Sequence, residues 1–238
     1  MNPSIPEPLL AEFSRFDTCT IANAIESFGV RLRNEGFTDA RVRCQTSLAG
    51  PMVGHAVTLR IRSGGPSMDG HRYFEGTTWW NAVLAQPAPR VVVIQDLDAG
   101  PAAGSFIGQV HAAILKVLGG VGLLTDGAVR DLPALAAAGF PVFAASVSVS
   151  HAYAHIVEWG GEIEVAGLKI RPGDWLHGDA HGVVSIPPSI GAGIPAAARR
   201  SLEREESILA ACADPAVTPA RLRAVLESMN PPARSGPS

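Results

Sequence analysis

The sequence has few cysteines, and their positions do not suggest a shared site. Its 238 residues include three cysteines, Cys19, Cys44 and Cys212, which lie far apart and form no CxxC pair. An odd number of widely separated cysteines excludes a disulfide-stabilised scaffold and a thiolate zinc site. The pattern is typical of a protein in a reducing compartment.

Long apolar runs and tracts of one charge are also absent. No stretch approaches the roughly 20 apolar residues that a membrane-spanning helix needs, and the N-terminal MNPSIPEPLL lacks the features of a signal peptide. The net charge is -3, and no run of lysine and arginine is present to attract a nucleic acid. We therefore expect a soluble, cytoplasmic protein that binds neither a membrane nor a nucleic acid.

Lysine is scarce as well. Of the 19 lysine and arginine residues, only Lys116 and Lys169 are lysines. A codon bias toward arginine explains this scarcity. A lysine that forms a Schiff base must be desolvated or lie beside another cation. Lys116 falls late in an expected helix and Lys169 in the turn-flanked segment GLKIRPGD, so we expect both at the surface. Covalent lysine catalysis is therefore not expected.

The residues that are present indicate one compact α/β domain. Hydrophobic residues make up 47% and charged residues 17% of the chain, as in globular proteins. Before residue 90 the pattern predicts a helix over Asp17–Phe28, a strand over Met52–Arg62, a loop over Ser63–Gly76 and a helix over Thr77–Leu84. We expect a single domain over residues 1–238, with its core in residues 17–190.

The middle of the chain predicts a parallel strand–helix–strand–helix–strand unit. Its expected elements, in order, are a strand at Val91–Ile94, a loop at Gln95–Gly104, a helix at Ser105–Leu118, a strand at Gly122–Thr125, the loop DGAVRD at 126–131, a helix at Leu132–Ala138 and a strand at Pro141–Ala145. The helix at Ser105–Leu118 is expected to bury one apolar face, formed by Phe106, Val110, Ala113, Ile114 and Val117.

After Ser146 the pattern changes. Short apolar runs separated by glycine-containing turns predict antiparallel strands between Val157 and Pro187. Two amphipathic helices are expected at Ile194–Cys212 and Pro219–Met229, followed by a frayed tail.

The loop 126–131 offers the clearest candidate site. Ligands of open α/β sheets bind beyond the carboxyl ends of the strands, and Arg130 and Asp131 follow one such strand. An arginine can hold a carboxylate in a bidentate fork, and an aspartate can hold a hard cation. The alternative is structural: Asp131 stands where a helix N-cap is expected, and from spacing alone the N-cap is favoured by about two to one.

Other motifs carry weaker signals. The segment AGPAAG is neither GxGxxG nor a P-loop, which argues against a nucleotide cofactor. His151 and His155 have the spacing of a zinc pair without the HExxH glutamate, and His177, Asp179 and His181 alternate as on one face of a strand. A metal site is one interpretation of each set, and solvated or hydrogen-bonded side chains are the other.

Three segments together resemble a known family. GGVGLLTDGAVRDLPAL, DTCTIANAIESFG and VAGLKIRPGDWLHGDAHGVVSIP are similar to the family of the regulator of ribonuclease activity A, which also contains the 4-hydroxy-4-methyl-2-oxoglutarate/4-carboxy-4-hydroxy-2-oxoadipate aldolases. The resemblance covers most of residues 17–190. It implies a three-layer β/β/α swivelling-type α/β domain with a parallel βαβαβ unit and C-terminal helices, assembled as a homotrimer or a dimer of trimers with sites between subunits.

The resemblance also implies a site. By the aldolase pattern, the main-chain amides at the start of a helix led by Gly108 bind a pyruvate carboxylate, with Gly108, Gln109, Val110 and His111 lining the substrate. Arg130 contacts the substrate, and Asp131 ligates Mg²⁺ or Mn²⁺. The implied reaction is retro-aldol cleavage or oxaloacetate decarboxylation, each of which forms a pyruvate enolate that the cation and Arg130 stabilise.

Two positions depart from the aldolase pattern. Ala134 stands where the aldolases have an acid three residues beyond the metal-binding aspartate, and Gln109 replaces a residue that is commonly acidic. The ribonuclease regulators also lack the acid at the first position. The sequence therefore leaves two hypotheses: a divalent-metal lyase acting on a small oxo-acid, favoured by Arg130 and Asp131, and a non-catalytic, protein-binding regulator, favoured by Ala134.

Assembly is a further expectation. Trp79, Trp80 and the apolar faces of the two C-terminal helices suggest more hydrophobic surface than a monomer exposes. Together with the resemblance, this predicts a homotrimer or hexamer.

Overall fold

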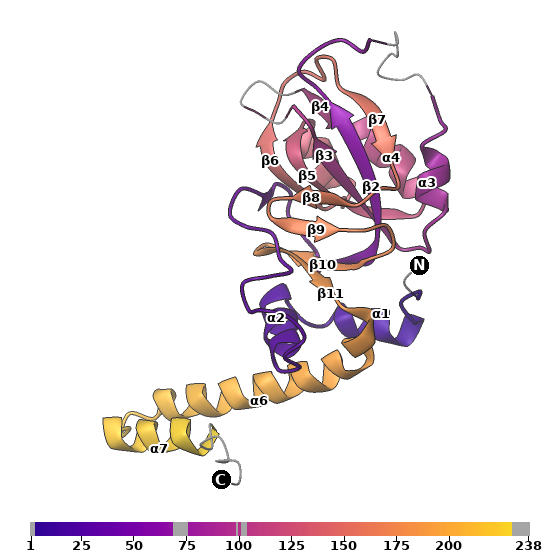
Figure 1. The fold of residues 1–238 in the computed structure, drawn as a ribbon. Coiled ribbons are helices and arrows are strands. Elements are labelled where there is room, and N and C mark those ends of the chain that lie inside the picture. The colour runs from indigo at the N-terminus through magenta and orange to yellow at the C-terminus, as the bar shows by residue number, and fades with distance from the viewer. Residues whose placement is uncertain (1–2, 69–75, 99, 101–103, 230–238) are drawn as a thin grey trace.

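The computed structural model of the chain describes residues 3–68, 76–98, 100 and 104–229, and its centre is a mixed sheet (Figure 1). Its strands are β1 (Arg43–Cys44), β2 (Met52–Arg62), β3 (Arg90–Asp96), β4 (Ser105–Ile107), β5 (Gly120–Val129), β6 (Val142–Val147), β7 (His155–Trp159), β10 (Trp175–Asp179) and β11 (Gly182–Ile186). They run in the order β1-β6-β5-β3-β2-β10-β11, with β4 beside β5 and β7 beside β2.

The parallel unit predicted for the middle of the chain is confirmed. Strand β3 pairs in parallel with β5, and β5 pairs in parallel with β6. The connections carry helices α4 (Gln109–Val117) and α5 (Leu132–Ala137). This arrangement brings the carboxyl ends of three strands to one edge, where Asp96, Asp126 and Arg130 lie at or just beyond the strands.

The sheet is covered on both faces. On one face α4, α5 and the short helix α3 (Trp80–Leu84) enclose a core that includes Leu59, Ile94, Leu115 and Leu135. On the other face the hairpin β8 (Ile163–Val165) and β9 (Leu168–Ile170) packs over a second apolar cluster. The result is a layered mixed α/β structure, in agreement with the predicted class; the swivelling-type description stays a prediction.

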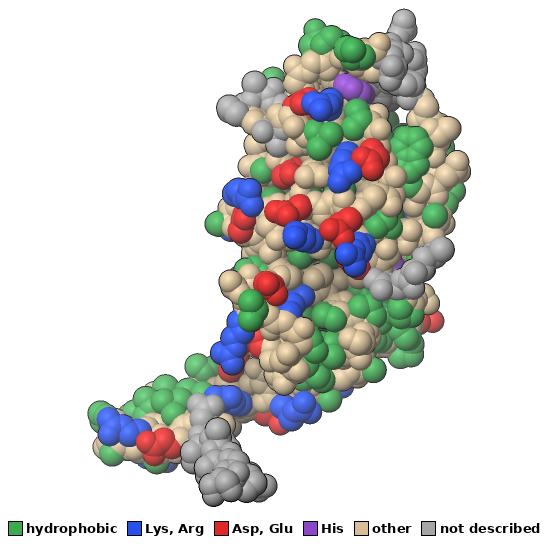
Figure 2. Space-filling model, viewed as in Figure 1, with side chains coloured by type: hydrophobic (Ala, Val, Ile, Leu, Met, Phe, Trp, Pro, Cys, Tyr) green, Lys and Arg blue, Asp and Glu red, His purple; other side chains and the backbone are tan. Residues whose placement is uncertain are grey.

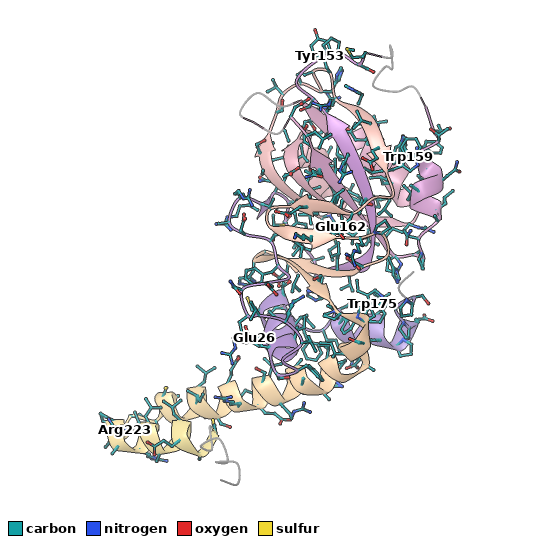
Figure 3. All side chains as sticks on the ribbon, in the orientation of Figure 1. Glu26, Tyr153, Trp159, Glu162, Trp175 and Arg223 are labelled. Atoms are coloured by element: carbon teal, nitrogen blue, oxygen red, sulfur yellow. The ribbon has the colours of Figure 1, made fainter. Side chains whose placement is uncertain are left out.

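Helices form a separate group at the end of the sheet that carries β10 and β11. They are α1 (Glu7–Phe13), α2 (Thr18–Glu26), the 3₁₀ helix η1 (Pro188–Gly193), α6 (Ile194–Ala213) and α7 (Pro219–Met229). A third apolar cluster joins α1, α2 and the start of α6 to the strands, with Trp175 at its centre (Figure 3). The rest of α6 extends away from this body and α7 folds back along it as an arm (Figure 1).

The helix expected at Ser105–Leu118 begins later than predicted. Residues Ser105–Ile107 are strand β4, which pairs with β5, and Gly108 is the N-cap of α4. The predicted apolar face is therefore wrong: α4 buries His111, Ala112 and Leu115, whereas Val117 is 88% exposed. The cause is pairing with β5, which takes the first three residues out of the helical period.

Smaller differences have similar causes. Strand β5 continues through a bulge at Asp126 and Gly127 to Val129, so that only the last two residues of the predicted loop 126–131 leave the strand. Helix α3 starts at Trp80, three residues after the predicted start. Much of the predicted loop Ser63–Gly76, part of Gln95–Gly104 and the predicted C-terminal tail lie outside the described residues.

The two tryptophans do not form an exposed surface. Trp79 is buried, with 7% of its surface exposed, and its ring contacts Trp80 and Phe106 edge-on. Trp80 packs against the same core. The expectation of exposed hydrophobic surface is wrong for Trp79, and Trp80 is half-buried, because both side chains lie against the core beneath the short helix α3. Apolar side chains are instead exposed on the arm, as at Leu209 and Leu226.

Among the residues that the structure describes, no helix combines the length and apolar character required to cross a membrane. The face in Figure 2 carries acidic and basic side chains interspersed, without a large area of one sign.

Candidate functional site

The candidate site forms where two segments far apart in the sequence meet. Strand β4 ends at Ile107, whose carbonyl accepts a hydrogen bond from the main-chain N–H of Arg130 at 3.1 Å. The next residue, Gly108, is the extended N-cap of α4, and Asp131 is the residue before α5. The parallel pairing of β4 with β5 thus places the start of α4 beside Arg130 and Asp131.

Asp131 caps a different helix from the one expected. Its φ of 58° lies in the left-handed region, whereas an N-cap residue usually has extended backbone. Its side chain makes no capping hydrogen bond to α5. Instead, its Oδ2 accepts a hydrogen bond of 3.0 Å from the main-chain N–H of Gln109, the first residue of α4. The predicted structural role is therefore present, but at the neighbouring helix.

Arg130 lies beside this carboxylate and retains an unused donor. Its Nε is 3.7 Å from Oδ2 of Asp131, beyond hydrogen-bond distance. This Nε is buried and has no acceptor among the described residues, although 29% of the side chain is exposed. Buried donors are almost always satisfied, so the arrangement indicates a position for an anion.

The missing side chain of Gly108 makes room for this arrangement. A Cβ at this position would lie 2.5 Å from Oδ2 of Asp131 and 3.1 Å from Nε of Arg130. The helix start, the guanidinium and the carboxylate therefore converge on the space in front of the Gly108 Cα. The backbone there is extended, so glycine is required by the close approach and not by its φ angle.

The other residues predicted at the start of α4 differ in their exposure. Gln109 and Val110 are exposed, and Val110 has 56% of its surface accessible. The ring of His111 is buried against Phe106, with 4.7 Å between ring centroids. Burial, with a smaller contribution from the nearby charge of Arg130, lowers the pKa of His111 to about 4. Its imidazole is consequently neutral at physiological pH.

Sequence reasoning missed a pair of acids at the same edge of the sheet, of which Asp96 is buried and Asp126 half-buried. Asp96, at the end of β3, accepts hydrogen bonds from Oγ of Ser63 at 2.5 Å and from the main-chain N–H of Asp98 at 3.0 Å. Asp126, in the bulge of β5, accepts a hydrogen bond of 2.8 Å from the main-chain N–H of Asp96. Asp126 directly follows one predicted strand and Asp96 stands two residues after the neighbouring one, which is the signal that could have identified them.

The environment of Asp126 leads to a prediction about stability. Burial, opposed by hydrogen bonds and reinforced by the charge of Asp96, raises the pKa of Asp126 to about 6. A raised folded-state pKa means that the folded chain holds more protons between about pH 4 and 6, so the carboxyl destabilises the fold increasingly across that interval. The side chain of Asp126→Asn can still accept the hydrogen bond from the Asp96 N–H but carries no charge. The substitution should therefore stabilise the protein above pH 6 by about 1–2 kcal/mol.

Urea unfolding near pH 4 and near pH 8 tests this. The advantage of Asp126→Asn should be largest at the higher pH, and Glu206→Gln on the exposed face of α6 serves as the charge-matched control. An equal or smaller advantage at the higher pH would contradict the prediction.

The alternative metal site at His177, Asp179 and His181 is not supported. His177 is buried, with Nδ1 3.0 Å from Oγ1 of Thr18 and Nε2 3.2 Å from the carbonyl of Phe13. The carboxylate of Asp179 accepts hydrogen bonds from the main-chain N–H groups of Thr18 and His181. These side chains therefore fasten α2 to β10.

The pair His151 and His155 also fails as a zinc pair. The two residues lie in a loop and at the start of β7 and not on one helix face, and each Nδ1 faces a nearby carbonyl. In the described part of the chain no group of three or more His, Cys, Asp or Glu side chains is arranged to hold a metal.

A cavity of about 510 Å³ has a lining that includes none of Gly108, Arg130 and Asp131. Its lining consists of Ser14–Asp17, Cys44, Thr46–Pro51, Asp179 and Ala180. Asp17 and Asp179 both use carboxylate oxygens to cap the first turn of α2. Because both carboxylates of this cavity already cap α2, the site at Gly108, Arg130 and Asp131 remains the better candidate.

The sequence of this chain matches one family model and several known proteins. The model of the RraA-like family, described as Aldolase/RraA, matches residues 18–185. The chain is 30% identical over 147 residues to a protein of Halalkalibacterium halodurans, spanning 61% of this chain and 68% of that protein. It is 28% identical over 120 residues to a protein of Laribacter hongkongensis, spanning 49% and 73%. Both carry the name "Putative 4-hydroxy-4-methyl-2-oxoglutarate aldolase".

Solved structures share the fold at lower identity. An uncharacterized protein from Pseudomonas syringae pv. tomato aligns with a TM-score of 0.73 at 19% identity, over 96% of this chain and 97% of that one. RraAS2 of Streptomyces coelicolor, described as an unusual member of the RNase ES inhibitor RraA protein family, aligns with a TM-score of 0.67 at 20% identity. That alignment covers 87% of this chain and 96% of RraAS2.

Proposed function

The chain belongs to the RraA-like family, Aldolase/RraA, and on that premise we propose that it is a divalent-metal-dependent lyase. Its substrate is a small oxo-acid, which it cleaves by a retro-aldol reaction or decarboxylates, releasing pyruvate or a related oxo-acid. The observation that carries the proposal is the convergence of the start of α4, the buried Nε of Arg130 and the carboxylate of Asp131 on one space. The aldolase names of the relatives support the same reaction class.

The residues present fit a water-rich cation site. Asp131 is 40% exposed, and among the described residues the hydrogen bond that its carboxylate accepts is that of the Gln109 N–H. Mg²⁺ commonly binds through one or two carboxylates and completes its shell with water and substrate oxygens. Asp131 would hold the cation, with Ala134 and Gln109 supplying no further carboxylate. When bound, the cation would act as a Lewis acid toward the oxygen of the forming enolate.

The chain's own groups would hold the substrate. The main-chain N–H of Val110 belongs to the first turn of α4, where the helix supplies no acceptor, and the helix dipole favours an anion there. Arg130 would donate to the same carboxylate and then to the enolate, which carries more charge than the substrate carbonyl. The buried, neutral His111 adds no competing positive charge. Neither lysine is involved: Nζ of Lys116 donates to the carbonyl of Ala138, and Lys169 is exposed on β9.

As part of the same proposal, the enzyme assembles as a homotrimer or a dimer of trimers. The exposed apolar residues of the α6–α7 arm support an assembly of more than one chain. Neither a nucleic acid nor a membrane is a partner in this proposal.

Pyruvate release from a panel of oxo-acids, with added Mg²⁺ or Mn²⁺, tests the reaction. The panel should include oxaloacetate and hydroxy-oxo-diacids that differ in the group distant from the scissile bond. We expect turnover of at least one substrate that stops on chelation and returns with the cation. Absence of turnover on the whole panel would favour the alternative, a non-catalytic regulator, which the missing acid at Ala134 and the fold shared with RraAS2 support.

A further inference from the structure

The start of α4 already has an anion in this structure, and it comes from the chain itself. Oδ2 of Asp131 accepts the hydrogen bond of the Gln109 N–H, which is the first donor of the helix. The same oxygen is the protein atom nearest to the position of a Gly108 Cβ, at 2.5 Å. An incoming carboxylate that used the amides at this helix start would have to share the space with this oxygen.

We propose that Asp131 acts as an internal competitor for the substrate carboxylate, so that the cation must bind before the oxo-acid. The inference rests on the proposed function and adds an order of binding to it. Without a cation, the Asp131 carboxylate stays on the Gln109 N–H and repels a second carboxylate. Asp131 would leave the helix start if it turned to hold a cation, and the amides and Nε of Arg130 would then be available to the substrate.

The backbone conformation of Asp131 explains why its side chain can reach the start of α4 and could also hold a cation. Its left-handed conformation, with φ of 58°, directs the side chain back toward α4 and away from the α5 terminus that it precedes. Asp131 makes one hydrogen bond and one loose contact, the 3.7 Å approach to Arg130, among the described residues. With 40% of the side chain exposed, the carboxylate borders solvent on the side away from these contacts.

The unsatisfied Nε of Arg130 shows that the Asp131 carboxylate does not make every hydrogen bond that a substrate carboxylate could make at this position. It is buried, yet Oδ2 of Asp131 stops 3.7 Å away. A free carboxylate is not tied to the backbone and could approach both the Arg130 Nε and the helix amides at hydrogen-bond distance. The substrate can therefore satisfy a donor that Asp131 leaves unpaired.

Oxalate binding measured by calorimetry without metal, in excess chelator, tests the competition. Oxalate is a small planar dicarboxylate that resembles a pyruvate enolate in shape and charge. Asp131→Gly removes the carboxylate and suits a φ of 58°, so we expect it to bind oxalate about tenfold more tightly than the wild type. Asp131→Asn should fall between the two, because its amide oxygen still accepts from Gln109 but carries no charge.

Matched variants locate the effect. Glu227→Gln on α7 removes one negative charge from the arm and should bind oxalate like the wild type. The double variant Asp131→Gly with Arg130→Ala should lose the gain, because the guanidinium no longer meets the anion. Mn²⁺ should tighten oxalate binding to the wild type by at least about tenfold and change that of Asp131→Gly little. Circular dichroism confirms that each variant is folded.

The outcomes separate this inference from the proposed reaction. If Asp131→Gly binds oxalate no more tightly than the wild type in chelator, or if the double variant keeps the gain, the competition is refuted even where the wild type releases pyruvate. If the gain is present and confined to Arg130-containing variants while no oxo-acid is turned over, the competition stands and the lyase proposal fails.

Discussion

Arg130→Ala is expected to lower kcat/KM for the oxo-acid by ~100-fold or more, because it removes a charge-assisted fork that meets both substrate and enolate. In the structure this side chain brings a buried, unsatisfied Nε to the start of α4. The loss should appear in substrate affinity and in kcat, since the charge on the substrate increases as the enolate forms. Metal affinity should be almost unchanged, because Asp131 keeps its carboxylate.

Steady-state kinetics at saturating Mn²⁺ and direct Mn²⁺ titration measure the two effects separately. Arg130→Lys should recover part of the activity, since lysine keeps the charge but not the planar fork. Arg223→Ala, on the arm far from this site (Figure 3), is the control and should behave like the wild type. Wild-type kcat/KM in Arg130→Ala would mean that the substrate binds elsewhere.

Asp131→Asn is expected to reduce Mn²⁺ affinity by more than about 100-fold and to abolish turnover with it, because a neutral amide replaces the anionic ligand of a hard cation. The fold should lose little. An asparagine can still accept the hydrogen bond from Gln109 and tolerates the left-handed backbone. The cost to stability should be about 0.3–1 kcal/mol, the value of a charge at a helix start.

Melting curves with and without Mn²⁺, together with metal titration, distinguish this from a purely structural role. If Asp131 only caps α4, Asp131→Asn should retain both the metal-dependent rise in melting temperature and the activity. A rise that survives the substitution would place the cation elsewhere. His177 would not be the next candidate, because both of its ring nitrogens already face Thr18 and Phe13.

The sequence predicted the regular elements that depend on local signals. The strand Met52–Arg62, the helix α2 and the helices near 194–213 and 219–229 follow from apolar patterns within each segment. These signals lie within one element, so no knowledge of neighbouring strands is needed. The parallel βαβαβ unit follows in the same way from alternating strand and helix patterns.

The resemblance to RraA-like proteins predicted the candidate site better than periodicity did. It placed the helix start at Gly108, whereas the apolar pattern extended the helix back to Ser105 and chose the wrong buried face. Periodicity failed there because Phe106 and Ile107 are buried by pairing with β5, a contact between residues about 20 positions apart. A pattern within one segment does not encode which strand will lie beside it.

The sequence by itself therefore determined the candidate residues: through the resemblance it indicates Gly108, Arg130 and Asp131, and it contains only two lysines. Only the tertiary structure decided what they contact. It placed the carboxylate of Asp131 on α4 in place of α5, left Nε of Arg130 without an acceptor among the described residues, and engaged His177 in the core. The reason is physical: a left-handed backbone at one residue and the pairing of β4 with β5 fix where each side chain points, and both depend on long-range packing.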